Sequence, residues 1–474
     1  MWAVDSNVGN GIPLRLRFEQ RTTSSTPGSI GGPGGGETWD GDDDTNDDGQ
    51  ILAPETTTLH GGAIVQWVYT ANVDMTGSIQ GFPMPAFDWT NFNVYSTYVL
   101  MRNSSGATDS IYVLDDNGDL KPYSFTLPGV DIVGPLLWTT EPGGHYVYFG
   151  TSAGEVYRLI DNGSSLVPAG GSWSTPYVDG TNLLAVTSPV MSDGLNLYFA
   201  GQASTAPIFA LYKVEIATKS APNPRISLSS VLVTTGFAWW DTLAGRYIYG
   251  ASQASGGQSY IGRAVASSWT IDAVFASPSL NPPAADCTSN FTGSVNVTNW
   301  AFGPAPYLYV AEENGYVHAV NAAGTAADFS TQRPGFPFRD KVSAVKSSVV
   351  IDFGTNRVFF GNDAGDLYTM GNFGAGWVLN SNYFRLATPG GLPLQGMPLF
   401  SYGVLYASNT GGKVFVVDVN NGAGGQTLAR TYNLGSNALG DISRDPEFGR
   451  IYVASSGGRL YAVDGFADPT PGAP

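Results

Sequence analysis

RIYVASSGGRLYAVD, from Arg450 to Asp464, is the stretch that decides the fold of this 474-residue chain. Apolar and aromatic residues alternate with other residues on both sides of a polar turn, and this period of two predicts two β-strands joined as a hairpin. The turn closes on Gly458, where glycine permits the positive φ of a tight hairpin. Both faces of such a hairpin carry apolar side chains, so we expect it to be stacked between similar units.

The same pattern returns along the chain from about residue 61 onward. Four further copies are clear and three are weaker, and together with the first they make eight: Tyr146–Asp161, Tyr307–Asn321, Arg357–Met370 and Val404–Asp418, then Thr97–Asp115, Leu197–Val214 and Arg246–Val265. The turn glycines Gly315, Gly365, Gly412 and Gly458 are 50, 47 and 46 residues apart. A period of about 50 residues is the length of a four-stranded propeller blade with its loops. We therefore predict an all-β fold, an eight-bladed β-propeller with an irregular N-terminal arm.

Each copy is expected to supply the two middle strands of its blade. Segments just upstream, such as SPVM (Ser188–Met191) and GMPLF (Gly396–Phe400), are expected to form the innermost strands. The last copy ends too near residue 474 to be followed by a full outer strand, so an upstream segment has to supply one. AIVQWVYT (Ala63–Thr70) is apolar and precedes the first blade, and pairing it with the last blade would close the ring and remove exposed edges.

Residues 1–60 form the arm, and residues 61–474 form the propeller. The arm contains a flexible linker by composition, TTSSTPGSIGGPGGG, followed by an acidic stretch. Within that stretch the spacing of oxygen donors, with Gly49 at the sixth position, matches the loop by which an EF-hand wraps Ca²⁺. The expected calcium ligands are Asp44, Asn46, Asp48, Gln50 through its backbone carbonyl, and Glu55. The alternative is an acidic linker that repels itself and stays extended, because no amphipathic helix flanks the loop.

The copies, above all IYVASSGGRLYAVDG and VYFGTSAGEVYRLID, resemble the repeat of the pyrroloquinoline-quinone-like propellers. That superfamily includes quinoprotein alcohol dehydrogenases, outer-membrane assembly scaffolds and, more distantly, the propellers of pilus-tip adhesins. The dehydrogenases carry adjacent cysteines and a tryptophan-docking ending in most repeats. This chain has one cysteine, Cys287, and no copy of that ending, so the resemblance implies the non-catalytic branch.

Charge and composition restrict the partners. The formal net charge is −17, which disfavours nucleic acid and anionic membrane surfaces. The chain has no apolar run of about 18 residues that would span a bilayer. Few charged residues and many Gly, Ser, Thr and Asn indicate an extracellular or cell-surface protein, with the periplasm as the alternative.

Candidate catalytic residues are few. The three histidines are His60, His145 and His318, and the last two fall in or beside expected strands, where a packed or surface role is commoner than ligation. No H-x-x-x-H or C-x-x-C spacing occurs. The sequence thus predicts no catalytic or cofactor-binding residue outside the calcium loop.

We expect a non-enzymatic module that binds other protein chains through its arm and its propeller faces. A subunit of a surface fibre or pilus, with a role in adhesion, follows by analogy with pilus-tip propellers. The competing prediction is an enzyme, either a quinoprotein-type dehydrogenase or a polysaccharide-active enzyme that uses the central funnel.

Overall fold

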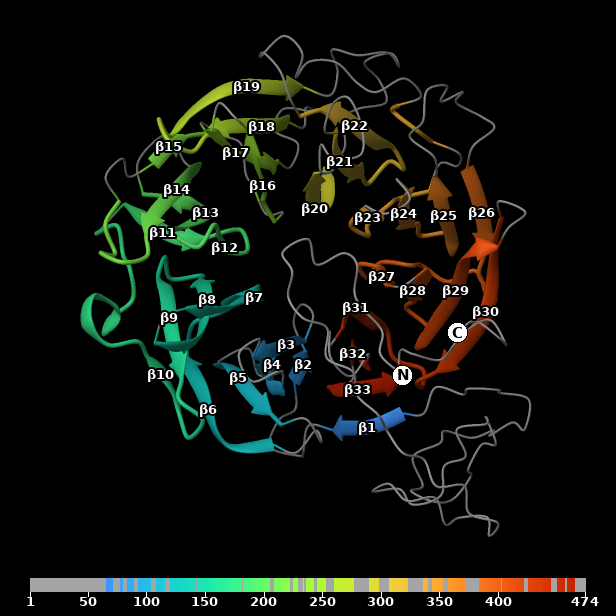
Figure 1. Ribbon diagram of the computed structural model, residues 1–474, viewed down its shortest axis with the longest axis horizontal. Helices are drawn as coiled ribbons and strands as arrows, with labels where there is room; N and C mark the ends of the chain where they lie inside the picture. Colours follow the sequence, from blue (N-terminus) through green and yellow to red (C-terminus); the bar gives the residue numbers. More distant parts are fainter. Residues whose placement is uncertain are drawn as a thin grey trace.

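The described part of the chain is almost entirely β-strand, arranged as eight sheets around a ring (Figure 1). The computed structural model describes residues 65–70, 77–79, 83–88, 93–103, 108–115, 120–141, 143–180, 182–204, 209–221, 225–228, 233, 236–242, 245–252, 260–276, 290–297, 307–322, 336–339, 343–352, 357–370, 383–401, 403–421, 425–444, 450–456 and 458–464. The predicted eight-bladed β-propeller is confirmed.

Blades 1 to 4 occupy the first half of the ring. Blade 1 comprises β2 (Gly77–Ile79), β3 (Met84–Asp88), β4 (Asn93–Asn103), β5 (Thr108–Leu114) and β6 (Leu120–Pro128). Blade 2 comprises β7 (Ile132–Glu141), β8 (Gly144–Thr151), β9 (Val156–Asp161) and β10 (Leu166–Pro168), and a short 3₁₀ turn, η1 (Gly171–Trp173), follows it. Blade 3 comprises β11 (Leu183–Val186), β12 (Met191–Ser192), β13 (Asn196–Ala203), β14 (Phe209–Glu215) and β15 (Arg225–Ser227). Blade 4 comprises β16 (Ala238–Thr242), β17 (Gly245–Ala251), β18 (Tyr260–Val265) and β19 (Thr270–Ala276).

Blades 5 to 8 complete the ring. Blade 5 has three described strands, β20 (Phe291–Val297), β21 (Tyr307–Glu312) and β22 (Val317–Asn321). Blade 6 comprises β23 (Val350–Asp352), β24 (Arg357–Gly361), β25 (Asp366–Met370) and β26 (Tyr383–Ala387). Blade 7 comprises β27 (Leu399–Ser401), β28 (Val404–Ser408), β29 (Lys413–Asn421) and β30 (Gly425–Asn433). Blade 8 comprises β31 (Leu439–Arg444), β32 (Arg450–Ser455), β33 (Arg459–Asp464) and β1 (Val65–Thr70).

Seven of the eight sequence copies form the two middle strands of a blade, as predicted, and the copy in blade 5 forms β21 and β22, the last two of its three described strands. The closing strand is also confirmed, because β1 pairs antiparallel with β33, from Val65 opposite Val463 to Thr70 opposite Arg459. The first described strand of the chain therefore forms the outer strand of the last blade, and the ring has no break at blade 8.

The prediction for one innermost strand was wrong. Ser188–Met191 is not a single strand: its first three residues lie between β11 and β12, Met191 begins β12, and both strands pair with β13. Pro189 has no N–H to donate to a ladder. The Ser188 hydroxyl oxygen accepts the Ala200 N–H instead, at 2.8 Å. In blade 7 the expected strand Gly396–Phe400 is shifted, since β27 begins at Leu399, after Pro398.

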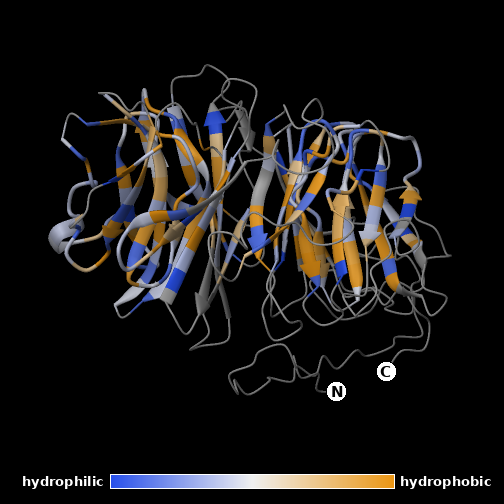
Figure 2. Cartoon of the chain, turned by 90° about the horizontal axis from the view of Figure 1, so that it is seen from above, coloured by the Kyte–Doolittle hydropathy of each residue, from blue (hydrophilic) through white to orange (hydrophobic). Residues whose placement is uncertain are grey.

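The core consists of eight clusters of buried side chains, and each cluster lies between two neighbouring blades. Alternate residues of one strand enter different clusters. Val147 and Phe149 pack toward blade 1, whereas Tyr146 and Tyr148 pack toward blade 3. Figure 2 shows this layering from the side, with apolar residues running along the strands of every blade that is coloured. Burial of both sheet faces supplies the main favourable free energy of folding.

Candidate functional site

One face of the ring, which we call the turn face, carries the hairpin turns between the two middle strands. In six blades a residue near the start of this turn donates its N–H to a carbonyl upstream of the innermost strand of the same blade. The turns therefore lie on the same face as the segments that lead into the innermost strands. These bonds run from Ser152 to Asp131, Ser204 to Asn182, Glu313 to Asn290, Asp363 to Ala344, Thr410 to Pro393 and Ser456 to Ala438.

The turns are held by side-chain oxygens at their first residue. Thr151 Oγ1 accepts the N–H groups of Ala153 and Glu155, at 3.3 and 3.1 Å. Asn362 and Asn409 do the same in blades 6 and 7, each binding the N–H groups two and four residues further on. Because two orphan N–H groups are satisfied locally, these turns are rigid supports for whatever the face presents.

Among the residues that the structure describes, three large hydrophobic side chains are exposed on this face. Val178 is 52%, Leu184 49% and Leu392 42% exposed. Leu184 directly follows Leu183, whose carbonyl oxygen would lie 2.3 Å from a Cβ added at Gly154. Leu392 also lies beside a turn, because its own carbonyl oxygen is close to the position that a Cβ at Gly365 would take. Val178 follows Tyr177, which bridges to Val156 at the end of the blade 2 turn.

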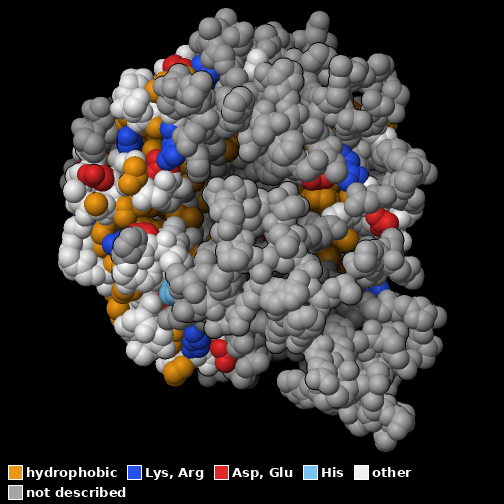
Figure 3. All heavy atoms as spheres, viewed as in Figure 1, with side chains coloured by type: hydrophobic (Ala, Val, Ile, Leu, Met, Phe, Trp, Pro, Cys, Tyr) orange, Lys and Arg blue, Asp and Glu red, His pale blue; other side chains and the backbone are white. Residues whose placement is uncertain are grey.

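These side chains form two separate sites on the ring. Val178 and Leu184 belong to the junction of blades 2 and 3, and Leu392 to that of blades 6 and 7, on the opposite side of the ring in Figure 1. Figure 3 shows the described surface over β9–β14 as a mixture of apolar and uncharged polar groups with a few charges between them. Exposed side chains beside rigid turns are in a position to contact another molecule.

At the other ends of the strands, donors from one blade bind the next blade at the end of its second middle strand. Trp173 Nε1, beside blade 2, donates to the carbonyl of Ile216 in blade 3 at 2.6 Å. Lys213 Nζ of blade 3 donates to Ala266 of blade 4 at 2.7 Å. Further contacts of this kind run from Tyr249 to the Ala322 carbonyl, from Arg357 to the Val419 carbonyl, and from Tyr98 to the Asp161 carboxylate.

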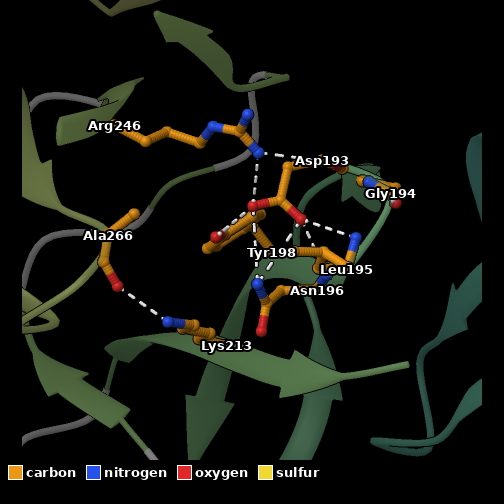
Figure 4. Close-up of polar contacts among 9 residues, drawn as sticks. Asp193, Gly194, Leu195, Asn196, Tyr198, Lys213, Arg246 and Ala266 are labelled. Atoms are coloured by element: carbon orange, nitrogen blue, oxygen red, sulfur yellow. Dashed lines mark hydrogen bonds and ion pairs between the residues drawn. The ribbon is translucent and has the colours of Figure 1, made fainter. Parts of the chain in front are cut away.

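Asp193 is the centre of the clamp between blades 3 and 4 (Figure 4). Its Oδ1 accepts the N–H groups of Leu195 and Asn196, and its Oδ2 accepts the Tyr198 hydroxyl at 2.8 Å and pairs with Arg246 Nη1 at 2.8 Å. Burial by itself would raise the pKa of Asp193, but these hydrogen bonds outweigh it and hold the pKa below its ordinary value. The carboxylate therefore stays ionised and joins two blades.

A second polar cluster lies within blade 2. Glu141 accepts the Tyr148 hydroxyl at 2.5 Å and pairs with Arg158 Nη2 at 2.7 Å, while Arg158 Nε donates to the Tyr148 oxygen. Burial, followed by the hydrogen bond to Glu141, raises the pKa of Tyr148 far above its ordinary value. Both carboxylate oxygens of Glu141 are thus engaged, and the group serves to hold strands together.

Asp441 is different because it lies on β31, the innermost strand of blade 8. The register of β31 against β32 shifts between Leu439 and Ile442, and a bulge of this kind turns a side chain to a new direction. Asp441 Oδ1 accepts the Met397 N–H at 2.6 Å, and burial raises the pKa of the carboxyl. Sequence reasoning missed this residue, since a bulge leaves no period-two signal.

The predicted calcium ligands Asp44, Asn46, Asp48, Gln50 and Glu55 lie outside the described residues, as do the rest of residues 1–60. Within the described ranges no three His, Cys, Asp or Glu side chains are grouped so as to hold a metal ion.

Two of the histidines are described. The His145 ring stacks on Trp138 with 5.8 Å between ring centroids, and His318 is completely buried. A packed or surface role, as opposed to metal ligation, was the expectation for both. The described part of the chain also contains no helix that is long and apolar enough to cross a bilayer.

Comparisons with known proteins place the chain by fold. No protein-family model and no curated protein matches the sequence. Among solved structures it is similar to BamB from Moraxella catarrhalis, with 13% identity and a TM-score of 0.51 over 85% of this chain and 98% of that one. It is similar to the C-terminal WD40 domain of Sif2, with 12% identity and a TM-score of 0.53 over 83% and 99%. For Sqt1 from Saccharomyces cerevisiae the values are 10% and 0.53 over 83% and 97%. Likeness at this level of identity shows the fold alone, a β-propeller.

Proposed function

We propose that this protein is a non-catalytic propeller that acts as a structural and protein-interaction module through its turn face. The observation that carries the proposal is the exposure of Val178, Leu184 and Leu392 beside turns that are fixed by their own side chains. Apolar groups held on rigid loops lose little conformational entropy when a partner covers them. The blade 2 and blade 3 carboxylates Glu141 and Asp193 are engaged in bonds between strands and between blades, which leaves them unsuited to proton transfer with a substrate.

Site-specific photo-crosslinking in the native source tests this proposal. A photoreactive residue placed at Leu184 or Val178 is expected to yield a discrete adduct with another protein chain. The matched control is Ser164, an exposed residue in the turn between β9 and β10 at the opposite end of blade 2. Equal labelling at Ser164 and Leu184, or no adduct from Leu184, would refute a binding role for the turn face.

Asp441 favours the competing function, an enzyme that acts near the ring axis. A carboxyl whose pKa is raised by burial has the property required of a general acid. An assay of turnover distinguishes the two functions, either with alcohols in the presence of added pyrroloquinoline quinone and Ca²⁺ or with polysaccharide substrates. Turnover that disappears in Asp441→Asn would replace the interaction proposal with the enzyme.

For location we propose an extracellular or cell-surface site and assembly into a fibre or pilus, through the arm and the propeller faces. The support is compositional: only 13% of residues are charged. Protease treatment of intact source cells is the test. Loss of the protein without cell lysis is expected, and full protection from protease contradicts the surface location.

We further propose that Asp44, Asn46, Asp48, Gln50 and Glu55 bind Ca²⁺ and stiffen the arm. The support is the spacing of oxygen donors in the sequence. Chelation is expected to speed proteolysis within residues 1–60 in the native chain. The variant Asp44→Ala with Asp48→Ala should be cleaved at the faster rate with or without Ca²⁺. Identical cleavage of the native chain in excess chelator would count against the site.

A further inference from the structure

The turns between the middle strands of blades 2, 5, 6, 7 and 8 share one pattern, and blade 5 differs from the others in two side chains. In four of these blades the first turn residue donates its N–H to the carbonyl four residues later, at 2.8 to 3.0 Å, which fixes the equivalence of the positions. The equivalent first residues in blades 2, 6, 7 and 8 are uncharged and polar: Thr151, Asn362, Asn409 and Ser455. In blade 5 this position is Glu312.

A second position changes with the first. Six residues after the first turn residue, the other four blades carry an aromatic ring: Tyr157, Tyr368, Phe415 and Tyr461. Blade 5 carries His318 there. Among these copies, only blade 5 has an acid and a base at two positions where the other blades carry side chains that are uncharged at neutral pH.

The two replacements face each other. His318 Nε2 lies 3.5 Å from Glu312 Oε1, and both side chains are 0% exposed. Neither carboxylate oxygen of Glu312 accepts a hydrogen bond from any residue that the structure describes. The Glu312 side chain therefore does not cap its own turn as those of Thr151 and Asn362 do, and its carboxylate lies against the imidazole instead.

The surroundings are aromatic and contain few charges. The Phe291 ring lies 5.6 Å from the His318 ring, edge to face, and the Tyr316 ring lies 6.4 Å away. Titratable or charged groups near the pair include Tyr316, Arg339 stacked over the Tyr316 ring at 4.6 Å, and Glu313, which is exposed and bound by Asn290. A buried charge in such surroundings is stable only when an opposite charge compensates it.

We propose that Glu312 and His318 form a proton-dependent latch that holds the turn of blade 5, residues 312–316. While the imidazole is protonated and the carboxylate ionised, the opposite charges compensate each other. When the imidazole loses its proton as the pH rises, the buried carboxylate loses the positive charge that lies directly against it, and the turn opens to hydrate it. This inference does not depend on the turn face binding a protein.

Hydrogen exchange at two pH values tests the latch. In the native chain the protection factors of the amides from Glu312 to Val320, which already correct for intrinsic exchange, are expected to fall about tenfold between pH 6 and pH 9. The variant Glu312→Asn with His318→Tyr restores residues found in the other copies and should change less than twofold. Blade 2 is an internal control, because Glu141 pairs there with an arginine, which keeps its charge over this range.

A second measurement on the native chain keeps the proposal testable should the double variant fail to fold. The imidazole of His318 can be titrated by NMR with labelled histidine, and its midpoint should coincide with the midpoint of the loss of protection in residues 312–320. Protection that does not change with pH, or that changes at a pH unrelated to the His318 titration, would overturn the latch. The same pH dependence in the double variant would overturn it as well.

Discussion

At the scale of single residues, the described buried carboxylates act mainly between strands and blades. Asp193 takes two backbone N–H groups from its own turn, a hydroxyl from Tyr198 and an ion pair from Arg246 of the next blade. Asp161 does the same between blades 1 and 2, where it accepts the hydroxyls of Tyr98 and Tyr123. Each carboxylate accepts several hydrogen bonds, some of them from a neighbouring blade. Removing the carboxylate therefore leaves several donors unsatisfied.

Asp193→Ala is expected to lower the free energy of unfolding by about 2–4 kcal/mol, because a largely buried pair is broken and Tyr198 loses its acceptor. The control Asp131→Asn, an exposed acid at 3.8 Å from Arg102, should change it by less than about 0.5 kcal/mol. Urea denaturation measures both. Equal effects of the two substitutions would contradict the clamp.

The same carboxylate predicts an acid dependence. Since the pKa of Asp193 is lowered in the folded state, its stabilisation is present above the ordinary value of 3.8 and is lost as the pH falls through the lowered pKa. The difference in stability between the native chain and Asp193→Asn should therefore be constant at neutral pH and vanish only in strong acid. A difference that persists unchanged at pH 2 would contradict this sign.

At the scale of elements, the turns of the middle strands are fixed by glycine as well as by side-chain caps. Gly154 has φ of +75°, and a Cβ there would lie 2.3 Å from the Leu183 carbonyl oxygen at the start of β11. Glycine is therefore required at this position for two reasons: the backbone is left-handed, and the next blade approaches closely.

Gly154→Ala should destabilise the protein by about 2–4 kcal/mol, the sum of the left-handed backbone cost and the overlap with blade 3. Gly129→Ala is the matched control, because Gly129 has φ of +73° and nothing within 4 Å of the added Cβ. It should cost only about 1 kcal/mol. Thermal unfolding of both variants measures the difference, and similar melting temperatures would show that packing against blade 3 contributes little.

The middle strands were predictable from the sequence, whereas the inner strands and the polar sites were not. A middle strand is buried on both faces, so aromatic and β-branched residues mark it from end to end, as in Tyr146–Phe149. An innermost strand is short and interrupted, as at Pro189, and its apolar pattern is too brief to set its limits. The pairing of Glu312 with His318 depends on which way two side chains turn, and a bulge decides the direction of Asp441.

At the scale of the whole molecule, the ring depends on one strand from the other end of the chain. β1 is bonded to β33, and β33 is bonded to β32, so blade 8 is assembled from residues 65–70 and 439–464. Without β1 the unpaired edge of β33 would be open to any other strand.

A chain that begins at residue 71 is therefore expected to self-associate, while one that begins at residue 65 remains monodisperse to the same concentration as the full chain. Light scattering measures both. A monodisperse shorter chain with an unchanged melting temperature would show that β1 contributes little to the closure of the ring.

The pairing of β1 with β33 also has a consequence for biosynthesis. A ribosome makes β1 before the intervening blades and β33 after them, so β1 has no partner while those blades emerge and fold. A truncated translation product lacks β33 altogether, and its β1 stays unpaired however well the other blades have formed. The ring can therefore close only in a chain whose translation has continued through β33.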